Sequence, residues 1–455
     1  MTKVLRIFDT LQKKKVDFVP NNAKHIKVYA CGPTVYNYAH IGNARMAVSC
    51  DLLVKVLKTI YPKVTYVSNI TDVDDKIIEE SKKSNTSIKN LTEKFSSIYN
   101  EDMSYLNVEK PDIQPKATDY IDHMIKFIIN LIENKVAYVR DGHVLFHVPS
   151  YKFYGILSKR TIDEQIAGSR VEIAPYKKYP GDFVLWKPSK DNEPGWNSPW
   201  GFGRPGWHLE CSAMSKECLG FPFDIHAGGI DLTFPHHENE IAQSCSLNCN
   251  HEPQSFCKYW FHNGFVMSDG EKMSKSLGNI KLVHDLKNSF SGSVLRLALL
   301  KSHYRQPLNW TKKLLEESEK NLQKIQNIFG QSEMKNFKKY DSNEIPNEIW
   351  DALYDDLNTP KVFAYLLSMV KNVTESKKSE DLKKKIISTV SLLGIYPLSK
   401  DKKSLDISFI ENLIKKRNNA RSNKEYELAD KIRKEIESMG VTIEDKKNET
   451  TWIQK

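Results

Sequence analysis

Apolar residues in the first part of the chain recur at two different spacings. Residues 27–31 (Lys-Val-Tyr-Ala-Cys) form a short run that ends at a turn and predicts a buried strand. From residue 43 to about residue 60, apolar side chains recur at the spacing of a helix. Residues 64–70 predict a second strand, so this region is expected to form a βαβ unit.

A polar cluster at residues 71–75 follows the second predicted strand. Open α/β sheets bind ligands beyond the carboxyl ends of their strands, which makes this cluster a candidate for a binding edge. A further strand is predicted at 223–227, and it ends in Gly-Gly-Ile-Asp. Together these elements predict an α/β fold with a Rossmann-like, doubly wound parallel sheet.

The chain is expected to divide into four parts. The sheet domain is split and covers residues 1–115 and 206–285. An insertion at 116–205 separates its halves, and the Pro-, Gly- and Trp-rich end of this insertion does not predict regular elements. Residues 286–400 predict an α-helical bundle, and 406–455 a small C-terminal module.

Composition narrows the class of protein. The chain has 455 residues, of which 40% are hydrophobic and 27% charged, as in ordinary globular proteins. We find no apolar run near the roughly 20 residues that span a bilayer and no signal peptide, so no membrane association is expected. The net charge of +10 is compatible with an RNA partner. The seven cysteines lack a disulfide-framework spacing and predict reduced thiols in the cytoplasm.

Two short runs indicate phosphate binding. Residues 40–43 (His-Ile-Gly-Asn) stand where a turn opens onto the first helix, whose free backbone N–H groups and dipole suit a phosphate. His40 and Asn43 offer further hydrogen bonds. Residues 272–276 (Lys-Met-Ser-Lys-Ser) predict a mobile loop with two lysines that can neutralise a triphosphate. Each run alone is compatible with a buried turn or a solvated loop, but their order in one chain favours a nucleotide-activating enzyme.

Two groups of residues are candidate metal ligands. The first consists of Cys31, Cys211, His236 and Glu240. His236 and Glu240 are four residues apart, on one face of a helix, and zinc accepts thiolate, imidazole and carboxylate together. Spacing alone leaves open that the cysteines are small buried hydrophobes. The rival group, which lacks a tight C-x-x-C pair, consists of Cys245, Cys249, His251 and Cys257.

Taken together, these features resemble cysteinyl-tRNA synthetases, a family of class I aminoacyl-tRNA synthetases. The resemblance runs from Val4 to Trp452 and rests on residues 29–36, 69–76, 205–214, 234–243 and 272–276. The first metal group is specific to the cysteine enzymes, whereas methionine enzymes carry zinc on knuckles of paired cysteines. The family's first signature ends in His, where this chain has Asn43, which can donate a hydrogen bond but cannot carry charge.

The resemblance implies that the enzyme activates L-cysteine with ATP and transfers it to the 3′ end of cysteine tRNA. It implies one Zn²⁺ per subunit on the first metal group, Mg²⁺ with ATP, and a monomer. The implied catalytic residues are His40, Asn43, Lys272 and Lys275. The implied ATP contacts are His40, Gly42, Asn43, Asp231 and Lys275. The implied contacts of the amino acid are Gly32, Thr34, Thr71 and Trp207. The positions that match anticodon readers, with a solvated surface as the alternative, are Arg421, Asp445 and Trp452.

Two other functions stay open at this stage. An ATP-dependent cysteine ligase acting on an amino sugar would share the zinc and ATP sites. It would lack an anticodon-reading end, so the predicted helical bundle and C-terminal module count against it. A non-catalytic RNA-binding relative is the second alternative, suggested by Asn43.

Overall fold

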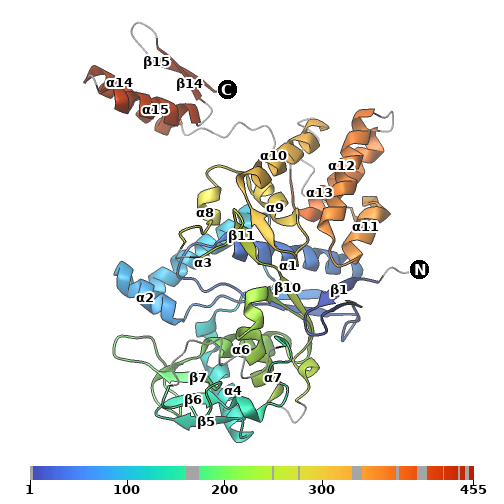
Figure 1. Ribbon diagram of the computed structural model, residues 1–455, viewed down its shortest axis with the longest axis vertical. Coiled ribbons are helices and arrows are strands. Elements are labelled where there is room, and N and C mark those ends of the chain that lie inside the picture. Colours follow the sequence, from blue (N-terminus) through green and yellow to red (C-terminus); the bar gives the residue numbers. More distant parts are fainter. Residues whose placement is uncertain are drawn as a thin grey trace. The chain divides into compact units, whose positions relative to one another are not determined.

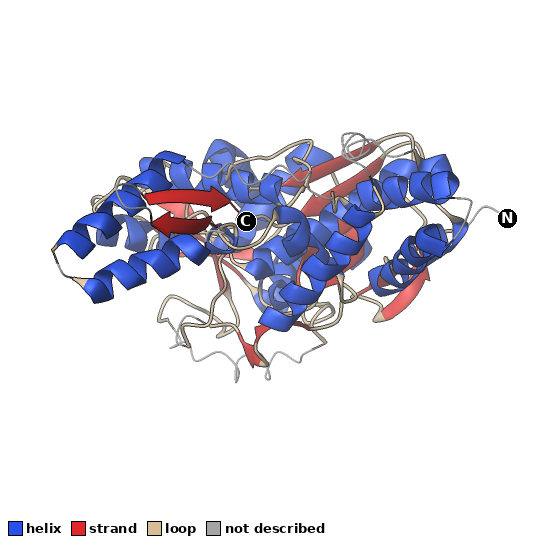
Figure 2. Ribbon diagram, turned by 90° about the horizontal axis from the view of Figure 1, so that it is seen from above, coloured by secondary structure: helices blue, strands red, loops and turns tan. Residues whose placement is uncertain are grey.

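The computed structural model describes the chain in two compact units, Met1–Pro397 and Leu398–Lys455 (Figure 1). The described residues are 4–159, 174–247, 251–274, 277–329, 341–375, 379–396, 407–423, 425–438, 441–445 and 450–454. Figure 2 distinguishes their helices and strands by colour. Within these ranges, we find no helix that combines the length and the apolar character needed to cross a membrane.

A four-stranded parallel sheet forms the centre of the first unit. Its strands, in the spatial order β10–β9–β3–β4, are β3 (Ile26–Ala30), β4 (Val64–Ser68), β9 (Phe223–Gly229) and β10 (Cys257–Asn263). In the middle of the sheet, Val28 of β3 pairs with Tyr66 of β4 and Ile225 of β9. The parallel sheet and three of its strands agree with the sequence prediction. The pattern did not predict β10, because nearly every residue of this strand is buried and polar positions do not alternate along it.

Helices cover both faces of this sheet. Val28 and Ala30 of β3 lie in a core that they share with α1 (Ile41–Ile60), while Tyr29 and Cys31 lie in a second core. The helices of the second core are α4 (Ile121–Glu133), α6 (Trp207–Leu219) and α7 (His236–Cys245). Because successive side chains of a strand point to opposite faces, the two cores lie on opposite sides of the sheet, as a doubly wound fold requires.

The segment between the two halves of the sheet is more regular than predicted. An antiparallel sheet there consists, in order, of β5 (Ala137–Arg140), β6 (His143–Phe146), β7 (Phe183–Pro188) and β8 (Gly203–Pro205). The expectation of irregular structure near residues 176–206 is therefore wrong for β7 and β8. Strand β7 carries buried Leu185 and Trp186 side by side, which hides the alternation of a strand. The helices before this sheet are α2 (Asp75–Ser84) and α3 (Ile88–Tyr105), and a hairpin of β1 (Arg6–Asp9) and β2 (Lys14–Asp17) opens the unit.

The rest of the first unit is mainly helical, as predicted. Its helices are α8 (Val283–Leu286), α9 (Gly292–Leu300), α10 (Lys312–Asn327), α11 (Asn347–Tyr354), α12 (Thr359–Glu375) and α13 (Ser379–Leu393). A small sheet consists of β11 (Val266–Ser268), β12 (Glu271–Lys272) and β13 (Leu308–Trp310). The second unit has its own apolar core, and its elements are α14 (Ile407–Ser422), α15 (Tyr426–Ser438), β14 (Val441–Asp445) and β15 (Thr450–Gln454).

Candidate functional site

A cavity of about 810 Å³ opens at the carboxyl ends of the parallel strands. The residues that follow or end β3, β9 and β10, namely Cys31, Gly229 and Asn263, all line it. Strand ends of an open α/β sheet are the expected place for a ligand. The same cavity is lined by His40 and Lys272, so both phosphate-binding runs of the sequence reach it.

The first group of candidate metal ligands lies together beside this cavity. Cys31 Sγ lies 3.6 Å from Cys211 Sγ, 3.5 Å from His236 Nε2 and 3.5 Å from Glu240 Oε1. His236 Nε2 lies 3.0 Å from the same Glu240 oxygen. All four side chains are buried, and their ligand atoms lie within 4.8 Å of one another. The structure thus brings together four residues, from the loop directly after β3 and from α6 and α7, as a group that can hold a metal ion.

A second group overlaps the first and was missed from the sequence. It combines Cys31 and Glu240 with His226 and His237. His237 Nε2 lies 3.3 Å from Cys31 Sγ, and His226 Nε2 lies 3.0 Å from Glu240 Oε2. The sequence offered one hint of His237, which directly follows the predicted ligand His236. No sequence pattern indicates that His226 on β9 lies beside them.

Burial keeps the histidines around this group neutral. It lowers the pKa of His236 and His237 well below the ordinary value. Burial also lowers the pKa of His208 and of His262 to about 3. His208 Nδ1 lies 3.0 Å from His236 Nδ1, and His262 Nε2 lies 2.8 Å from His237 Nδ1. A neutral imidazole is the form that binds metals, so these rings are in the correct state and are oriented by their neighbours.

The rival group of Cys245, Cys249, His251 and Cys257 finds no support. Cys249 lies outside the described residues. Among the residues that are described, Cys245, His251 and Cys257 do not form a group that could hold a metal ion. The thiol of Cys245 instead lies 3.4 Å from the carbonyl oxygen of Glu252.

The start of α1 differs from the sequence expectation of free backbone N–H groups. His40 is the N-cap residue, and its Nδ1 accepts hydrogen bonds from the backbone N–H groups of Gly42 (3.1 Å) and Asn43 (3.2 Å). Burial lowers the pKa of His40, although Asp231 acts to raise it. A neutral ring that accepts at Nδ1 carries its proton on Nε2, which is therefore the donor that His40 can offer to a ligand.

The imidazole of His40 also explains Gly42. A Cβ at residue 42 would lie 2.9 Å from two ring atoms of His40, so only glycine leaves room for this cap. The side-chain oxygen of Asn43 in turn accepts a hydrogen bond from the backbone N–H of His40 at 3.2 Å, which completes a capping box. The Nδ2 amide of Asn43 remains a donor, and this residue lines the cavity.

The described part of the lysine loop lies at the same cavity. Lys272 on β12 lines it and holds its ammonium group 5.3 Å from the centre of the Phe265 ring. Met273 also lines the cavity. Lys275 lies outside the described residues, so its predicted role stays a prediction.

The four predicted contacts of the amino acid fall into two groups. Gly32, Thr34 and Trp207 line the cavity, and the Trp207 ring stacks on His236 at 4.3 Å. Thr71 is only 2% exposed and is not part of the lining. Its hydroxyl group donates a hydrogen bond to Glu210 at 3.0 Å, so Thr71 lies behind the site.

The three predicted anticodon readers lie in the second unit. Arg421 is an exposed residue at the end of α14. Asp445 is the last residue of β14, where it pairs with Thr450. Trp452 on β15 lies opposite Ile443 and packs partly against the core of this unit. This packing is consistent with a structural role of Trp452 in the second unit as well as with the predicted contact with RNA.

Comparison with known proteins gives consistent matches over the whole chain. Residues 17–320 match the family described as "tRNA synthetases class I (C) catalytic domain", and residues 409–452 match "Cysteinyl-tRNA ligase anticodon binding domain". A cysteine–tRNA ligase of Pelagibacter ubique is 47% identical over 462 residues, which cover 99% of both chains. One from Maricaulis maris is 46% identical over 463 residues, 98% of both chains.

Solved structures with similar folds include a Mycobacterium tuberculosis methionyl-tRNA synthetase in complex with methionyl-adenylate. It has a TM-score of 0.57 at 14% sequence identity and covers 83% of this chain and 92% of its own. At this identity the likeness concerns the fold alone, and it agrees with the doubly wound sheet described above.

Proposed function

Because the chain belongs to the cysteine–tRNA ligase family of class I aminoacyl-tRNA synthetases, we propose that its cavity activates L-cysteine with ATP and then transfers it to cysteine tRNA. In the first step the carboxylate of cysteine attacks the α-phosphate of ATP, which releases pyrophosphate and leaves cysteinyl-adenylate. In the second step a hydroxyl group of the 3′-terminal ribose of the tRNA attacks the carbonyl carbon of the adenylate, which forms the cysteinyl ester and releases AMP. Such phosphoryl chemistry depends on positioning and charge stabilisation.

The observation that carries this proposal is the group of Cys31, Cys211, His236 and Glu240 beside a cavity that also holds the start of α1. We propose that these four residues hold one Zn²⁺ per subunit. Tetrahedral zinc, with bonds of about 2.1–2.3 Å, separates its ligand atoms by about 3.4–3.8 Å. The separations of 3.5–3.6 Å from Cys31 Sγ to the other three ligand atoms fit this geometry, whereas His236 Nε2 and Glu240 Oε1, at 3.0 Å, lie closer together than a bound ion would hold them.

A bound zinc ion supplies a soft Lewis acid that favours a substrate thiolate over a hydroxyl group. Serine differs from cysteine by one atom, and an apolar pocket alone discriminates such pairs poorly. This chain's own residues contribute the placement. Trp207 stacks on His236 and lines the cavity, which brings the wall of an amino-acid pocket next to the proposed ligands.

The overlapping group with His226 and His237 is the alternative ligand set. We favour the set with Cys211 because two sulfur ligands suit a thiol-selecting zinc ion. His226 then has a supporting role, since its Nε2 lies 3.0 Å from the Glu240 oxygen that faces away from His236. Such partners of a ligand fix its orientation.

The phosphates of ATP are placed by the start of α1 and by the lysine loop. We propose that His40 Nε2, the Asn43 amide and Lys272 stabilise the negative charge that develops, with Lys275 closing over the triphosphate and Mg²⁺ accompanying ATP. Gly42 permits the close approach of His40, and Asp231, which also lines the cavity, would contact the nucleotide. Gly32 and Thr34 would contact the amino acid, while Thr71 would support it from behind.

The remaining proposals concern the whole chain. We propose the domain limits 1–115 with 206–285, 116–205, 286–400 and 406–455, with Arg421, Asp445 and Trp452 reading the anticodon. We propose that the protein acts as a monomer. A substrate used in translation supports action in the cytoplasm. The match of residues 409–452 to an anticodon-binding domain weighs against an amino sugar as acceptor.

Cysteine-dependent exchange of pyrophosphate into ATP tests the proposal, together with the zinc content of the protein. In Cys211→Ser we expect loss of zinc and of exchange with cysteine. The matched control is Cys218→Ser on the same helix, whose thiol faces Tyr120 at 3.4 Å and which should retain both. The parent should exchange with cysteine and not with serine.

The outcome for zinc separates the two ligand sets. Full zinc in a folded Cys211→Ser protein, with loss of zinc in His237→Gln, would favour the set with His226 and His237. Absence of cysteine-dependent exchange in folded, zinc-loaded parent protein would instead favour a non-catalytic RNA-binding relative.

A further inference from the structure

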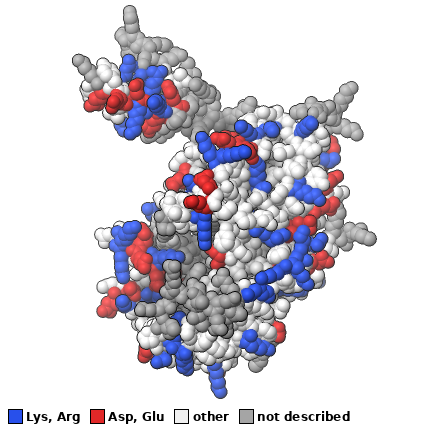
Figure 3. All heavy atoms as spheres, viewed as in Figure 1, with Lys and Arg blue, Asp and Glu red and all other residues white. Residues whose placement is uncertain are grey.

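One face of α2 contributes charged residues to the cavity that neither signature run includes. Lys76, Glu80 and Lys83 are spaced i, i+4 and i+7, and all three line the cavity. This spacing places them on one face of the helix. Another side of α2 buries Ile77 and Ile78 against the protein. In Figure 3, basic and acidic side chains lie together at the left-hand margin, where Figure 1 places α2.

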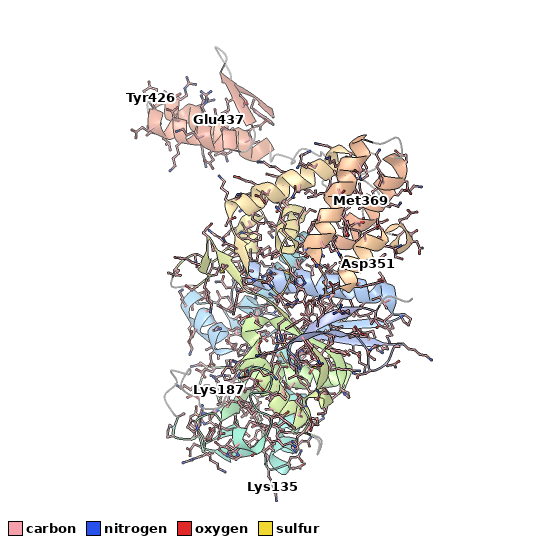
Figure 4. The ribbon with its side chains drawn as sticks, turned by 45° about the vertical axis from the view of Figure 1, so that its right-hand side comes forward. Lys135, Lys187, Asp351, Met369, Tyr426 and Glu437 are labelled. Atoms are coloured by element: carbon pink, nitrogen blue, oxygen red, sulfur yellow. The ribbon has the colours of Figure 1, made fainter. Side chains whose placement is uncertain are left out.

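Ion pairs fix the orientation of this helix. Asp75, its first residue, accepts hydrogen bonds from Lys187 at 2.7 Å and from Arg204 at 3.2 Å. Lys187 belongs to β7 and is labelled in Figure 4. Near the other end of α2, Lys82 lies 3.5 Å from Glu193. Both ends of α2 are therefore tied to the antiparallel sheet region, which holds the Lys76–Lys83 face toward the cavity.

The two cavity-lining lysines share their helix face with one acidic residue, Glu80, and Asp74 attracts Lys76 electrostatically. Lys82 pairs with Glu193, but we find no ion pair of Lys76 or Lys83 with a described residue. The Lys76 ammonium group lies 6.0 Å from the centre of the Tyr36 ring, and Tyr36 also lines the cavity. Proteins that bind single-stranded nucleic acids commonly combine basic side chains, which contact the phosphates, with aromatic rings, on which the bases stack.

The proposed reaction brings two polyanions into one cavity. The start of α1 and the lysine loop account for the phosphates of ATP, but not for those of the tRNA strand that must reach the adenylate. Seven residues of helix separate Lys76 from Lys83 by about 10.5 Å along the axis, so the two ammonium groups suit two separate phosphates of a strand better than a single phosphate group.

Resting on the proposed function, we infer that Lys76 and Lys83 bind the backbone phosphates of the single-stranded 3′ end of tRNA. Tyr36 provides a neighbouring surface for one of its bases. Helix α2 is thus an acceptor-strand contact in the first unit, whereas the proposed anticodon readers belong to the second.

The double variant Lys76→Ala/Lys83→Ala tests this inference. We expect the KM for tRNA in charging to rise about tenfold, while cysteine-dependent pyrophosphate exchange stays near the parent value. Each phosphate contact on a single strand contributes about 0.7 to the slope of log K against log salt. The slope of log K against log salt for tRNA binding, measured by fluorescence anisotropy, should therefore be smaller in magnitude by about 1.4 in the double variant.

Lys89→Ala is the matched control, because Lys89 is an exposed residue of the neighbouring helix α3 that pairs with Glu93 at 4.0 Å and is not part of the cavity lining. It should leave the salt slope unchanged. Lys76→Arg/Lys83→Arg should restore tRNA binding, since arginine keeps the charge.

An unchanged salt slope in the folded double alanine variant would overturn the inference, and so would an equal loss of pyrophosphate exchange, which would assign both lysines to ATP. Absence of exchange in the parent is a different result, because it refutes the proposed function. The anisotropy measurement reports on the lysines even then, since it needs no catalysis.

Discussion

At the scale of single residues, the start of α1 combines a structural and a chemical role in the same side chains. His40 caps the helix through Nδ1, and Asn43 closes the capping box from the third position. The second nitrogen of His40 and the amide of Asn43 are left to face the cavity. Asparagine at position 43 is therefore compatible with the site, because it offers both an acceptor for the cap and a donor for a phosphate.

Substitution of Asn43 separates these roles. Asn43→Ala should lower the free energy of unfolding by about 1 kcal/mol through loss of the cap. It should also slow pyrophosphate exchange on the order of 100-fold through loss of a donor. Asn43→His should retain exchange, because imidazole offers an acceptor and a donor. Exchange at the parent rate in Asn43→Ala, measured with saturating ATP, would show that Asn43 serves only the helix.

At the scale of elements, one buried arginine joins four segments of the first unit. Arg296 on α9 donates hydrogen bonds to the carbonyl oxygens of Leu106 after α3 (3.1 Å) and Leu393 at the end of α13 (2.6 Å). It also forms an ion pair with Asp51 on α1, where Lys55 lies 3.0 Å from the same carboxylate. Helix α1, whose first residues line the cavity, is thereby fixed to the helical part of the unit.

Asp51→Asn should destabilise the protein by about 3–5 kcal/mol, because it leaves a buried guanidinium group without its counter-charge. Chemical unfolding at pH 7 measures this. The control is Glu316→Gln, which breaks an exposed ion pair with Lys312 and should change stability by less than about 1 kcal/mol. Equal stability of Asp51→Asn and the parent would show that the carbonyl contacts alone hold Arg296.

The same pair predicts a pH dependence. Burial acts to raise the pKa of Asp51, but Arg296 and Lys55 outweigh it, so the pKa lies below its ordinary value. The unfolded chain has an Asp pKa of about 3.9. A lowered pKa in the folded state stabilises the protein above that value and loses this effect as the pH falls through the folded pKa. The difference in stability between the parent and Asp51→Asn should therefore shrink below about pH 4.

At the scale of the whole molecule, the two units have separate apolar cores. The candidate site lies entirely in Met1–Pro397, and the family match for anticodon binding lies in the second unit. Adenylate formation needs only the cavity, whereas selection of one tRNA needs bases that are read outside it. The two activities should therefore be separable at the boundary.

A chain that ends at Pro397 should fold and retain pyrophosphate exchange, because all described cavity residues remain. Its kcat/KM for charging cysteine tRNA should fall by about 100-fold or more, since several kcal/mol of binding energy are removed with the second unit. The measurement compares the truncated and the full-length protein in two assays, pyrophosphate exchange and charging of cysteine tRNA. Charging at the full-length rate would show that the second unit does not contribute to tRNA recognition.

Local patterns of apolar residues were sufficient to predict some of the strands and the first helix of the sheet domain. Strands β3, β4 and β9 were predicted as short runs that end at a turn or a polar cluster, and helix α1 was predicted from the helical spacing of its apolar residues. Strands β7 and β10 escape such a reading, because burial on both faces removes the alternation. The sequence alone also indicated the two phosphate-binding candidates, by their order in the chain, and the candidate metal ligands, by their residue types.

The arrangement of the site depends on contacts between distant residues. Cys31 meets Cys211 and Glu240 across 180 and 209 positions of the chain, and spacing has no information on such approaches. His226 and His237 enter the same group only because β9 lies beside β3. The lysines of α2 face the cavity for a similar reason, since ion pairs to β7 and its neighbours set the orientation of that helix. Residue types thus indicate which kinds of ligand the site can bind. The packing of segments far apart in the sequence determines which residues lie close enough to form it.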